Sequence, residues 1–289
     1  MQTWGYQKGE RVMKYKKGML FCEISPFTYK ISMQKEIVKR HIKNLIGKEK
    51  FAKKRSESKL PNVVSSYSSN LIKRAPGIDI TLQVNKAVNI EIACSTFNGL
   101  IIHPGETFSF WKLVGNTTKR KGYMAGRVLV GNKLVPGLGG GLCNLSNTLH
   151  LLVINSPLKV TEFHKHSDAL APDEGKRVPF GSGTSVSYNN LDYRFVNNTD
   201  QDIQLCAWCQ DEKLYAELRS EREFPNTYEI VEENHHFALE GAKYYRISKI
   251  YKVSKERESG EIVSKELILD NHSEVMYDYS LIPKELIKK

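Results

Sequence analysis

A glycine-rich segment that runs directly into an apolar-periodic stretch constrains this 289-residue chain most. Four of the five residues 137–141 are glycine, and leucines recur at helical spacing from Leu142 onward. The pattern predicts a tight loop followed by a helix, with Cys143 in the first helical turn. The helix is expected to end near residues 155–157, because the proline there cannot continue it.

The expected position of Cys143 favours thiol chemistry. The first N–H groups of a helix lack intrahelical partners and the helix dipole is positive there, so both favour a thiolate over a thiol. The same amides suit a developing oxyanion or a bound anion. The candidate binding residues lie in this loop and the first helical turns: Gly139, Gly140, Gly141, Asn144 and Ser146. The alternative is structural, with Cys143 packed as a small apolar side chain behind a tight turn.

Composition and cysteine usage exclude several classes of protein. No apolar run approaches the ~18 residues of a membrane-spanning helix, so no transmembrane segment is expected. Residues 1–20 lack the apolar core and cleavage site of a signal peptide, and five scattered cysteines argue against a disulfide framework. The glycine-rich segment lacks the Lys-Ser/Thr pair of a phosphate-binding loop, and no cofactor is predicted. We therefore expect a cytoplasmic protein, with a peripheral place at the inner membrane face as a second option.

The basic excess is concentrated in the first fifth of the chain. Residues 1–60 contain 16 Lys or Arg and 5 Asp or Glu, whereas the remaining residues contain 27 of each. Within this arm, residues 32–51 are predicted to form a helix, with an apolar stripe from Ile37 to Ile46 and lysines on the other face. A basic arm suits an anionic surface, and the alternative is a solvated helix docked on the main domain. No nucleic-acid motif accompanies it.

Hydrophobic periodicity predicts two central helices and many strands. One helix is expected from an N-cap at Asn85 to Gly99, and the other contains Cys143. A two-residue turn at 131–132 closes a hairpin that leads into the glycine-rich segment. From residue 158 the period becomes two, which is typical of antiparallel strands. The expected strands cover residues 100–103, 107–111, 127–130, 133–135, 160–166, 185–188, 192–196, 203–208, 213–218, 228–232, 244–253 and 261–269.

These elements predict an α+β fold, in which a mainly antiparallel β-sheet with central helices is preceded by a basic N-terminal helical arm. Three parts are expected along the chain. They are the basic helical arm at 1–60, a main domain at 61–220 and a C-terminal β extension at 221–289.

Some residues receive a structural interpretation. Cys94 and the aromatic residues at 107–111 are expected in the core, because apolar residues at regular spacing usually pack inside. Asp192 and Arg194 share a strand face, so they are expected to pair. Residues 63–79 show no clear period, and no element is predicted for them.

Seven different short motifs lie in the middle of the chain, among them PGETFSFW, GGGLC and EFHKHS. They lie at residues 85–89, 104–111, 121–123, 139–143, 162–167, 178–181 and 192–195. Together they resemble the VanW family, which is named for a protein of vancomycin B-type resistance gene clusters. The resemblance covers residues 61–219 and implies cell-wall or glycopeptide-resistance biology, without supplying a reaction. One position departs from the family pattern, because Asn144 stands where the family usually has glutamine.

A thiol enzyme is the leading functional hypothesis. Cys143 would be the nucleophile and His164 or His166 the base, since alternate residues of a strand share one face. Asp192 or Glu106 would orient the base. The substrate class would be a peptide or amide, related to the cell wall by analogy with the family resemblance.

Two other functions stay open. His164, His166 and Asp168 alternate, so they would suit a metal ion, to which Cys143 would add a thiolate. Alternatively, the glycine-rich loop binds an anion or a peptide terminus without catalysis. The C-x-x-C pair at 206–209 is expected to have no shared role, because its cysteines would face opposite sides of a strand.

Overall fold

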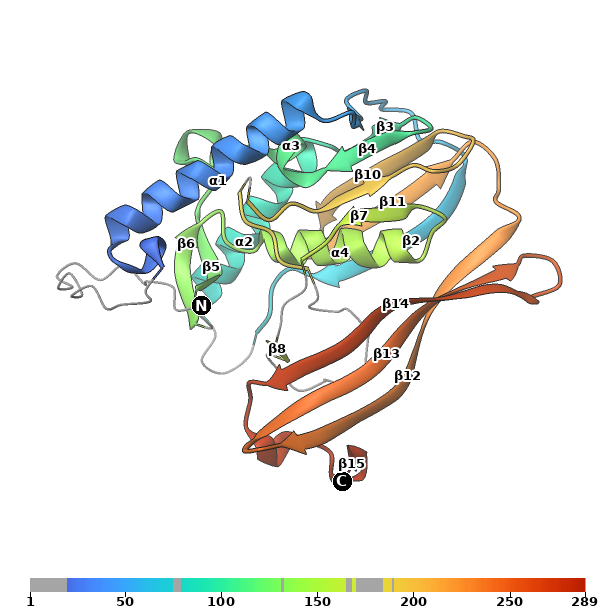
Figure 1. Ribbon diagram of the computed structural model, residues 1–289. Coiled ribbons are helices and arrows are strands. Elements are labelled where there is room, and N and C mark those ends of the chain that lie inside the picture. Colours follow the sequence, from blue (N-terminus) through green and yellow to red (C-terminus); the bar gives the residue numbers. More distant parts are fainter. Residues whose placement is uncertain are drawn as a thin grey trace.

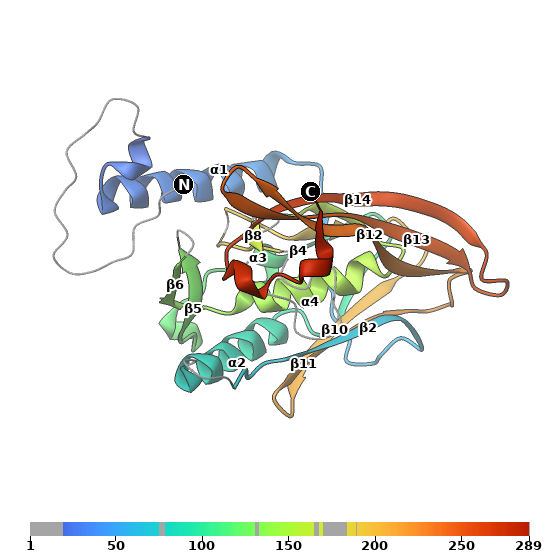
Figure 2. The ribbon, with the colours of Figure 1, turned by 90° about the horizontal axis from the view of Figure 1, so that it is seen from below.

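The computed structural model describes residues 20–74, 79–130, 133–164, 168–169, 184–188 and 190–288. The architecture is α+β, as predicted, with helices packed on mostly antiparallel sheets (Figure 1). The C-terminal strands form their own sheet beside the main body (Figures 1 and 2). In the described part of the chain, no helix is both long enough and apolar enough to cross a membrane.

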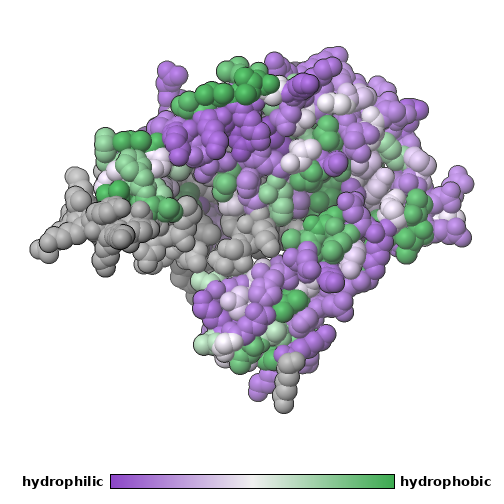
Figure 3. Space-filling view, viewed as in Figure 1, coloured by the Kyte–Doolittle hydropathy of each residue, from purple (hydrophilic) through white to green (hydrophobic). Residues whose placement is uncertain are grey.

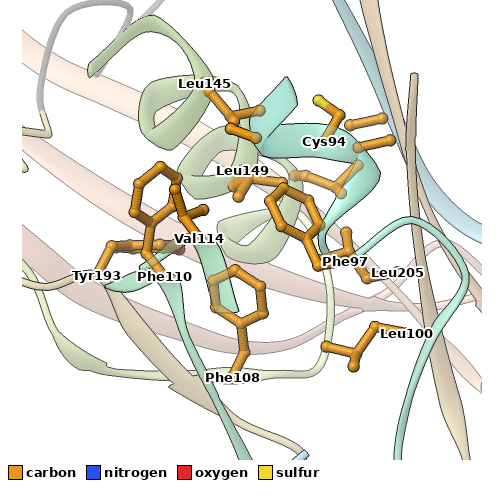
Figure 4. Close-up of a cluster of buried hydrophobic side chains, with 14 of the residues drawn as sticks. Cys94, Phe97, Leu100, Phe108, Phe110, Val114, Leu145, Leu149, Tyr193 and Leu205 are labelled. Carbon is orange, nitrogen blue, oxygen red and sulfur yellow. The ribbon is translucent and has the colours of Figure 1, made fainter. Parts of the chain in front are cut away.

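The central sheet is antiparallel and has the strand order β2-β11-β10-β3. Its strands are Asn62–Asn70 (β2), Lys213–Ser220 (β11), Ile203–Gln210 (β10) and Leu100–Ile102 (β3). The predicted central helices, Ile80–Ser95 (α2) and Leu142–Ile154 (α4), pack against this sheet and each other. Phe97, Leu149 and Leu205 meet in the apolar core between them (Figure 4).

A second sheet joins segments that lie far apart in the sequence. Its order is β1-β4-β9-β7, with the first pair parallel and the others antiparallel. The strands are Lys50–Phe51 (β1), Glu106–Ser109 (β4), Arg194–Val196 (β9) and Lys159–Glu162 (β7). Glu162 and Arg194 are partners in the ladder, so this sheet places two opposite charges side by side.

The third sheet contains three long antiparallel strands in the part predicted as a C-terminal β extension. They are Asn226–Glu240 (β12), Lys243–Glu256 (β13) and Ile262–Val275 (β14). Two short strands, Ile287–Lys288 (β15) and Asp168–Ala169 (β8), add to its edges in parallel. Leu151 and Ile154 of α4 cluster with Ile250 of β13, so an apolar contact joins this sheet to the helices.

The predicted hairpin before the glycine-rich segment is confirmed. Ala125–Val130 (β5) pairs with Lys133–Leu138 (β6), and the turn at 131–132 lies outside the described residues. The loop then enters α4, with Cys143 in its first turn and the end at Ile154, as predicted.

The strand expected at 107–111 is wrong beyond Ser109. The chain turns there into a short helix, Phe110–Val114 (α3), because the Ser109 hydroxyl caps the amide of Lys112. The aromatic side chains of this stretch are buried all the same, as expected.

The N-terminal helix begins and ends earlier than predicted for residues 32–51. It covers Pro26–Ile46 (α1), because Ser25 and Thr28 form a capping box and a proline suits the first helical position. The helix ends before Gly47, and the chain then joins the second sheet.

Two further boundaries differ from the prediction. α2 begins after Asp79, whose carboxylate caps its first turn, while Asn85 lies inside the helix and donates to the Ala125 carbonyl. Residues 62–70, for which no element is predicted, form β2. Serines occupy both faces of that strand, so its burial does not show as an apolar alternation.

Two predicted strands near the candidate site are also wrong. The strand expected at 160–166 ends at Glu162, so strand alternation no longer governs His164. The segment 185–188 is not a strand. Among the described residues, its β-pairing is limited to an isolated bridge between Ser187 and Leu191.

Candidate functional site

The glycine-rich loop is packed tightly against its neighbours. Gly141 is the N-cap of α4 and has a φ of 101°, a conformation that favours glycine. Gly140 lies against the backbone of Gly126, and its carbonyl accepts a 2.9 Å hydrogen bond from the Asn89 side chain. Gly139, with a φ of 73°, lies against a threonine side chain. Packing therefore accounts for all three glycines, whereas their predicted role in ligand binding stays a prediction.

The contact between Gly140 and Gly126 makes a direct stability prediction. A Cβ on Gly140 would lie 2.3 Å from the Gly126 carbonyl carbon, where the neighbour is backbone and has little freedom to move. Gly140→Ala is therefore expected to lower the free energy of unfolding by about 2–3 kcal/mol in urea titrations. Gly241→Ala is the control, because a Cβ there meets no atom within 4 Å and only its φ of 63° opposes the change. Its loss is expected to be about 1 kcal/mol; equal losses would contradict the packing argument.

Cys143 lies beneath the segment 184–188. Its Sγ lies 3.9 Å from the Val186 carbonyl oxygen, to which the thiol donates, and the Ser185 side chain also hydrogen-bonds the sulfur. Burial raises the pKa of the Cys143 thiol above its ordinary value, and this effect outweighs the hydrogen bonds at the sulfur, which lower the pKa. In this structure Cys143 is therefore a neutral thiol.

The next turn of α4 is tied to the same segment. The Ser146 hydroxyl lies within hydrogen-bond distance of the Cys143 and Thr184 carbonyl oxygens, at 3.0 and 3.2 Å. The Asn147 side-chain oxygen accepts from the Thr184 amide at 2.6 Å. Ser146 thus has an internal structural role. Asn144 differs, because its side-chain oxygen is buried and has no hydrogen-bond partner among the described residues.

His164 contacts a carboxylate that the sequence alone does not single out. Its Nε2 lies 2.9 Å from Oε1 of Glu162. The His164 carbonyl also accepts a 2.7 Å hydrogen bond from the Ser185 amide, and Ser185 contacts Cys143. The segments that carry the thiol and the imidazole are therefore neighbours. The available signal is the motif EFHKHS, in which the glutamate precedes the histidine by two positions.

Two arginines keep Glu162 ionised. Arg40 of α1 donates two hydrogen bonds of 2.6 Å to its carboxylate, and the Arg194 Nε lies 3.6 Å away. Burial by itself would raise the pKa of Glu162, but the hydrogen bonds from His164 and Arg40 and the two positive charges lower it to about 2. A carboxylate at Nε2 favours the tautomer with the proton on that nitrogen, which leaves Nδ1 of His164 as an acceptor.

Asp192, predicted as a candidate to orient the base, has other partners. Its buried carboxylate accepts from the Ser109 hydroxyl at 2.6 Å and from the Trp111 amide at 3.0 Å. It also accepts from Arg194 Nε at 2.7 Å, so the predicted pair is confirmed. These contacts place Asp192 at the start of α3. Glu106, the other candidate, accepts from the backbone amide of His103 in a turn.

A cavity of about 550 Å³ lies between α4 and the C-terminal sheet. Its polar and aromatic lining includes His150, Glu162, Phe163, Lys252 and Glu266. His150 stacks on Phe163 with ring centroids 4.6 Å apart, and burial lowers the pKa of His150 to about 3. Burial also lowers the pKa of Lys252 to about 8. Because Glu162 lines this cavity and contacts His164, a ligand in the cavity would lie beside the histidine–carboxylate pair.

The metal hypothesis stays a prediction. His166 lies outside the described residues, as does the side chain of Asp168. Among the residues that the structure describes, no three His, Cys, Asp or Glu side chains form a group suited to a metal ion. The C-x-x-C cysteines face opposite sides of β10, as expected, since they are three positions apart and Cys209 contacts Cys94 of α2.

Comparison with known proteins covers the region that carries these features. A family model described as "VanW like protein" matches residues 85–219, which contain the glycine-rich loop, α4 and the Glu162–His164 pair. Residues 85–219 are similar to the VanW family. The chain is 28% identical to the Vancomycin B-type resistance protein VanW of Enterococcus faecalis over 227 residues, which are 78% of this chain and 82% of that protein.

A second relative matches a shorter region of the chain. The uncharacterized protein YoaR of Bacillus subtilis is 32% identical over 123 residues, which are 43% of this chain and 39% of that protein. No solved structure matches the chain significantly. The family resemblance inferred from the motifs is thus confirmed.

Proposed function

We propose that this VanW-like chain is a thiol enzyme that acts on a peptide or amide in glycopeptide resistance or cell-envelope biology. Cys143 is the nucleophile, His164 is the base and Glu162 orients the imidazole. The observation that carries the proposal is the 2.9 Å contact between Glu162 and His164, on a segment adjacent to the thiol. The biological setting rests on the name of the Enterococcus faecalis relative.

The chemistry follows the order that a neutral thiol requires. Nδ1 of His164 takes the proton from Cys143, and the thiolate attacks the carbonyl carbon, so that an S–C bond forms and the C=O electron pair moves to oxygen. The C–N bond then breaks, and the imidazolium gives its proton to the leaving amine. Water or a second amine, deprotonated by His164, attacks the thioester, the C–S bond breaks, and the imidazolium returns its proton to the Cys143 sulfur. The product is an acid or a new amide.

The raised pKa of Cys143 supports a nucleophile that depends on a base. A thiol that is protonated at neutral pH becomes reactive only when a neighbouring group accepts its proton. The Glu162 carboxylate, which is ionised at neutral pH, stabilises the imidazolium formed in that step.

A second candidate function is non-catalytic binding of a peptide or anion. The cavity between α4 and the C-terminal sheet favours it, because a cavity with polar and aromatic lining provides recognition without requiring a reactive sulfur. Under this alternative, Cys143→Ser retains ligand binding and the biological effect.

Acylation by p-nitrophenyl acetate near neutral pH tests the proposal. Wild-type protein is expected to release nitrophenolate in a burst and to carry an acetyl group on Cys143, located by peptide mass spectrometry. Cys143→Ser should carry none at this position. His164→Ala should slow acetylation of Cys143 about 100-fold, because general-base catalysis contributes a factor of this order.

The chain offers a matched control for the histidine. His103 pairs with Asp202 at 2.7 Å on another part of the protein, so His103→Ala removes an equivalent contact and should leave the acetylation rate unchanged. Circular dichroism verifies that each variant is folded. Acetylation of Cys143 that is independent of His164, or no acetylation of the wild type, would overturn the enzyme proposal and leave the binding function.

A further inference from the structure

Helix α1 turns its apolar side away from the protein. Six large apolar side chains of α1 are exposed: Phe27, Ile31, Val38, Ile42, Leu45 and Ile46. The first five recur at helical spacing and form one stripe, in which Phe27 is 71% and Leu45 is 83% exposed. Figure 3 shows hydrophobic residues along the outer edge of the molecule, over α1. A helix docked on a globular domain normally buries such a stripe, so the orientation calls for an explanation.

The opposite side of α1 is held on the main body by polar contacts. Arg40 binds Glu162 through two hydrogen bonds and donates a third, at 3.0 Å, to the Asn190 carbonyl. Asn44, one turn further along, accepts from Arg194 at 2.7 Å. Because Arg40 and Asn44 lie on the helix side opposite the stripe, these contacts fix the stripe outward.

Basic side chains flank the stripe. Lys35, Lys39 and Lys43 follow one side of it at a spacing of four, and Lys30 lies on the other side. α1 contains five basic residues and one acidic residue, Glu36, which pairs with two of these lysines. Lysines beside an apolar stripe keep their methylene groups in the apolar boundary while their charges reach lipid phosphates.

We propose that α1 lies in the plane of an anionic phospholipid membrane, with its apolar stripe at the boundary between headgroups and acyl chains. The whole net charge of +11 belongs to residues 1–60, which gives the arm charge complementarity to anionic lipid. A second copy docked through the same stripe would bring two lysine-flanked helices together, and the like charges would oppose that contact. The proposal stands on α1 alone; through Arg40, this helix also joins the candidate site.

Co-sedimentation of the full chain with lipid vesicles tests the proposal. Binding is expected with vesicles of phosphatidylcholine and phosphatidylglycerol, with much weaker binding to phosphatidylcholine alone and a decline as salt screens the charges. The variant Val38→Ser/Leu45→Ser should lower the partition constant about 10-fold or more, because it removes two exposed apolar side chains from the stripe.

The control changes exposed apolar residues elsewhere. Leu239→Ser/Ile262→Ser alters two exposed side chains of the C-terminal sheet and should leave vesicle binding unchanged. No binding to anionic vesicles, or equal binding by the stripe variant and wild type, would overturn the proposal. The proposal would also be overturned if light scattering showed a dimer for the wild type and a monomer for the stripe variant, because the stripe would then bind a second copy of the chain. Vesicle binding and acetylation of Cys143 are measured separately, so either proposal can fail without the other.

Discussion

Replacing Asp192 with alanine is expected to lower the free energy of unfolding by about 3–5 kcal/mol. Asp192 is 1% exposed, and its carboxylate accepts from Ser109, from Arg194 and from the backbone amides of Trp111 and Tyr193. Alanine removes all of these acceptors and leaves the buried Nε of Arg194 without its closest partner. Arg194 keeps Glu49 and Glu162 as counter-charges. Urea unfolding of wild type and variant at neutral pH measures the difference.

An exposed pair of the same residue types is the control. Asp200 and Arg222 lie 3.2 Å apart with side chains 80% and 65% exposed, so Asp200→Ala should change stability by no more than about 0.5 kcal/mol. Adding Arg194→Met to Asp192→Ala should cost less than the sum of the single changes, since each single change already removes the hydrogen bond between these two side chains. An Asp192→Ala variant as stable as wild type would show that this carboxylate does not organise the start of α3. The predicted role of Asp192 in orienting the base would then again be the better explanation.

Features that local sequence determines were predictable. The glycine-rich loop, the start and end of α4 and the hairpin before it follow from turn residues and from leucine spacing within a few positions. The long C-terminal strands follow from alternation and from polar turns. Two helix starts were misplaced because the helices begin after the caps Ser25 and Asp79, six residues before the starts that the sequence predicted.

The candidate site was only partly predictable, because its contacts join distant segments. Cys143 could be placed from its own neighbourhood. Glu162 could not be singled out, since its hydrogen-bond partner Arg40 is 122 residues away and Arg194 reaches it through sheet pairing. Asp192 bonds Ser109 across 83 residues, so its structural role is also invisible in the sequence. Periodicity identifies elements, whereas pairings between elements decide which charges meet.

The second large effect is a loss of folding stability at acidic pH, which we expect to arise from His150. This side chain is buried, stacks on Phe163 and has Nδ1 3.3 Å from the Tyr193 hydroxyl. Burial lowers its pKa from 6.5 to about 3, so between these values the unfolded chain binds a proton that the folded chain does not. The stability gained by keeping His150 neutral is therefore fully present above pH 6.5 and is lost as the pH drops toward 3. The slope is about 1.4 kcal/mol per pH unit, which amounts to about 3 kcal/mol by about pH 4.

The variant His150→Gln isolates this contribution. Glutamine binds no proton in either state, so the difference in stability between wild type and variant should narrow from about pH 7 to about pH 4 in urea titrations. The lost stacking lowers the stability of the variant at every pH and does not affect the narrowing. Glu162, whose pKa is lowered to about 2, adds a loss of stability below pH 4.5 in both proteins, so it cancels. If the free energy of unfolding of His150→Gln changed with pH as that of the wild type does, the imidazole would be protonated in the folded state. The boundary between α4 and the C-terminal sheet would then have to admit water.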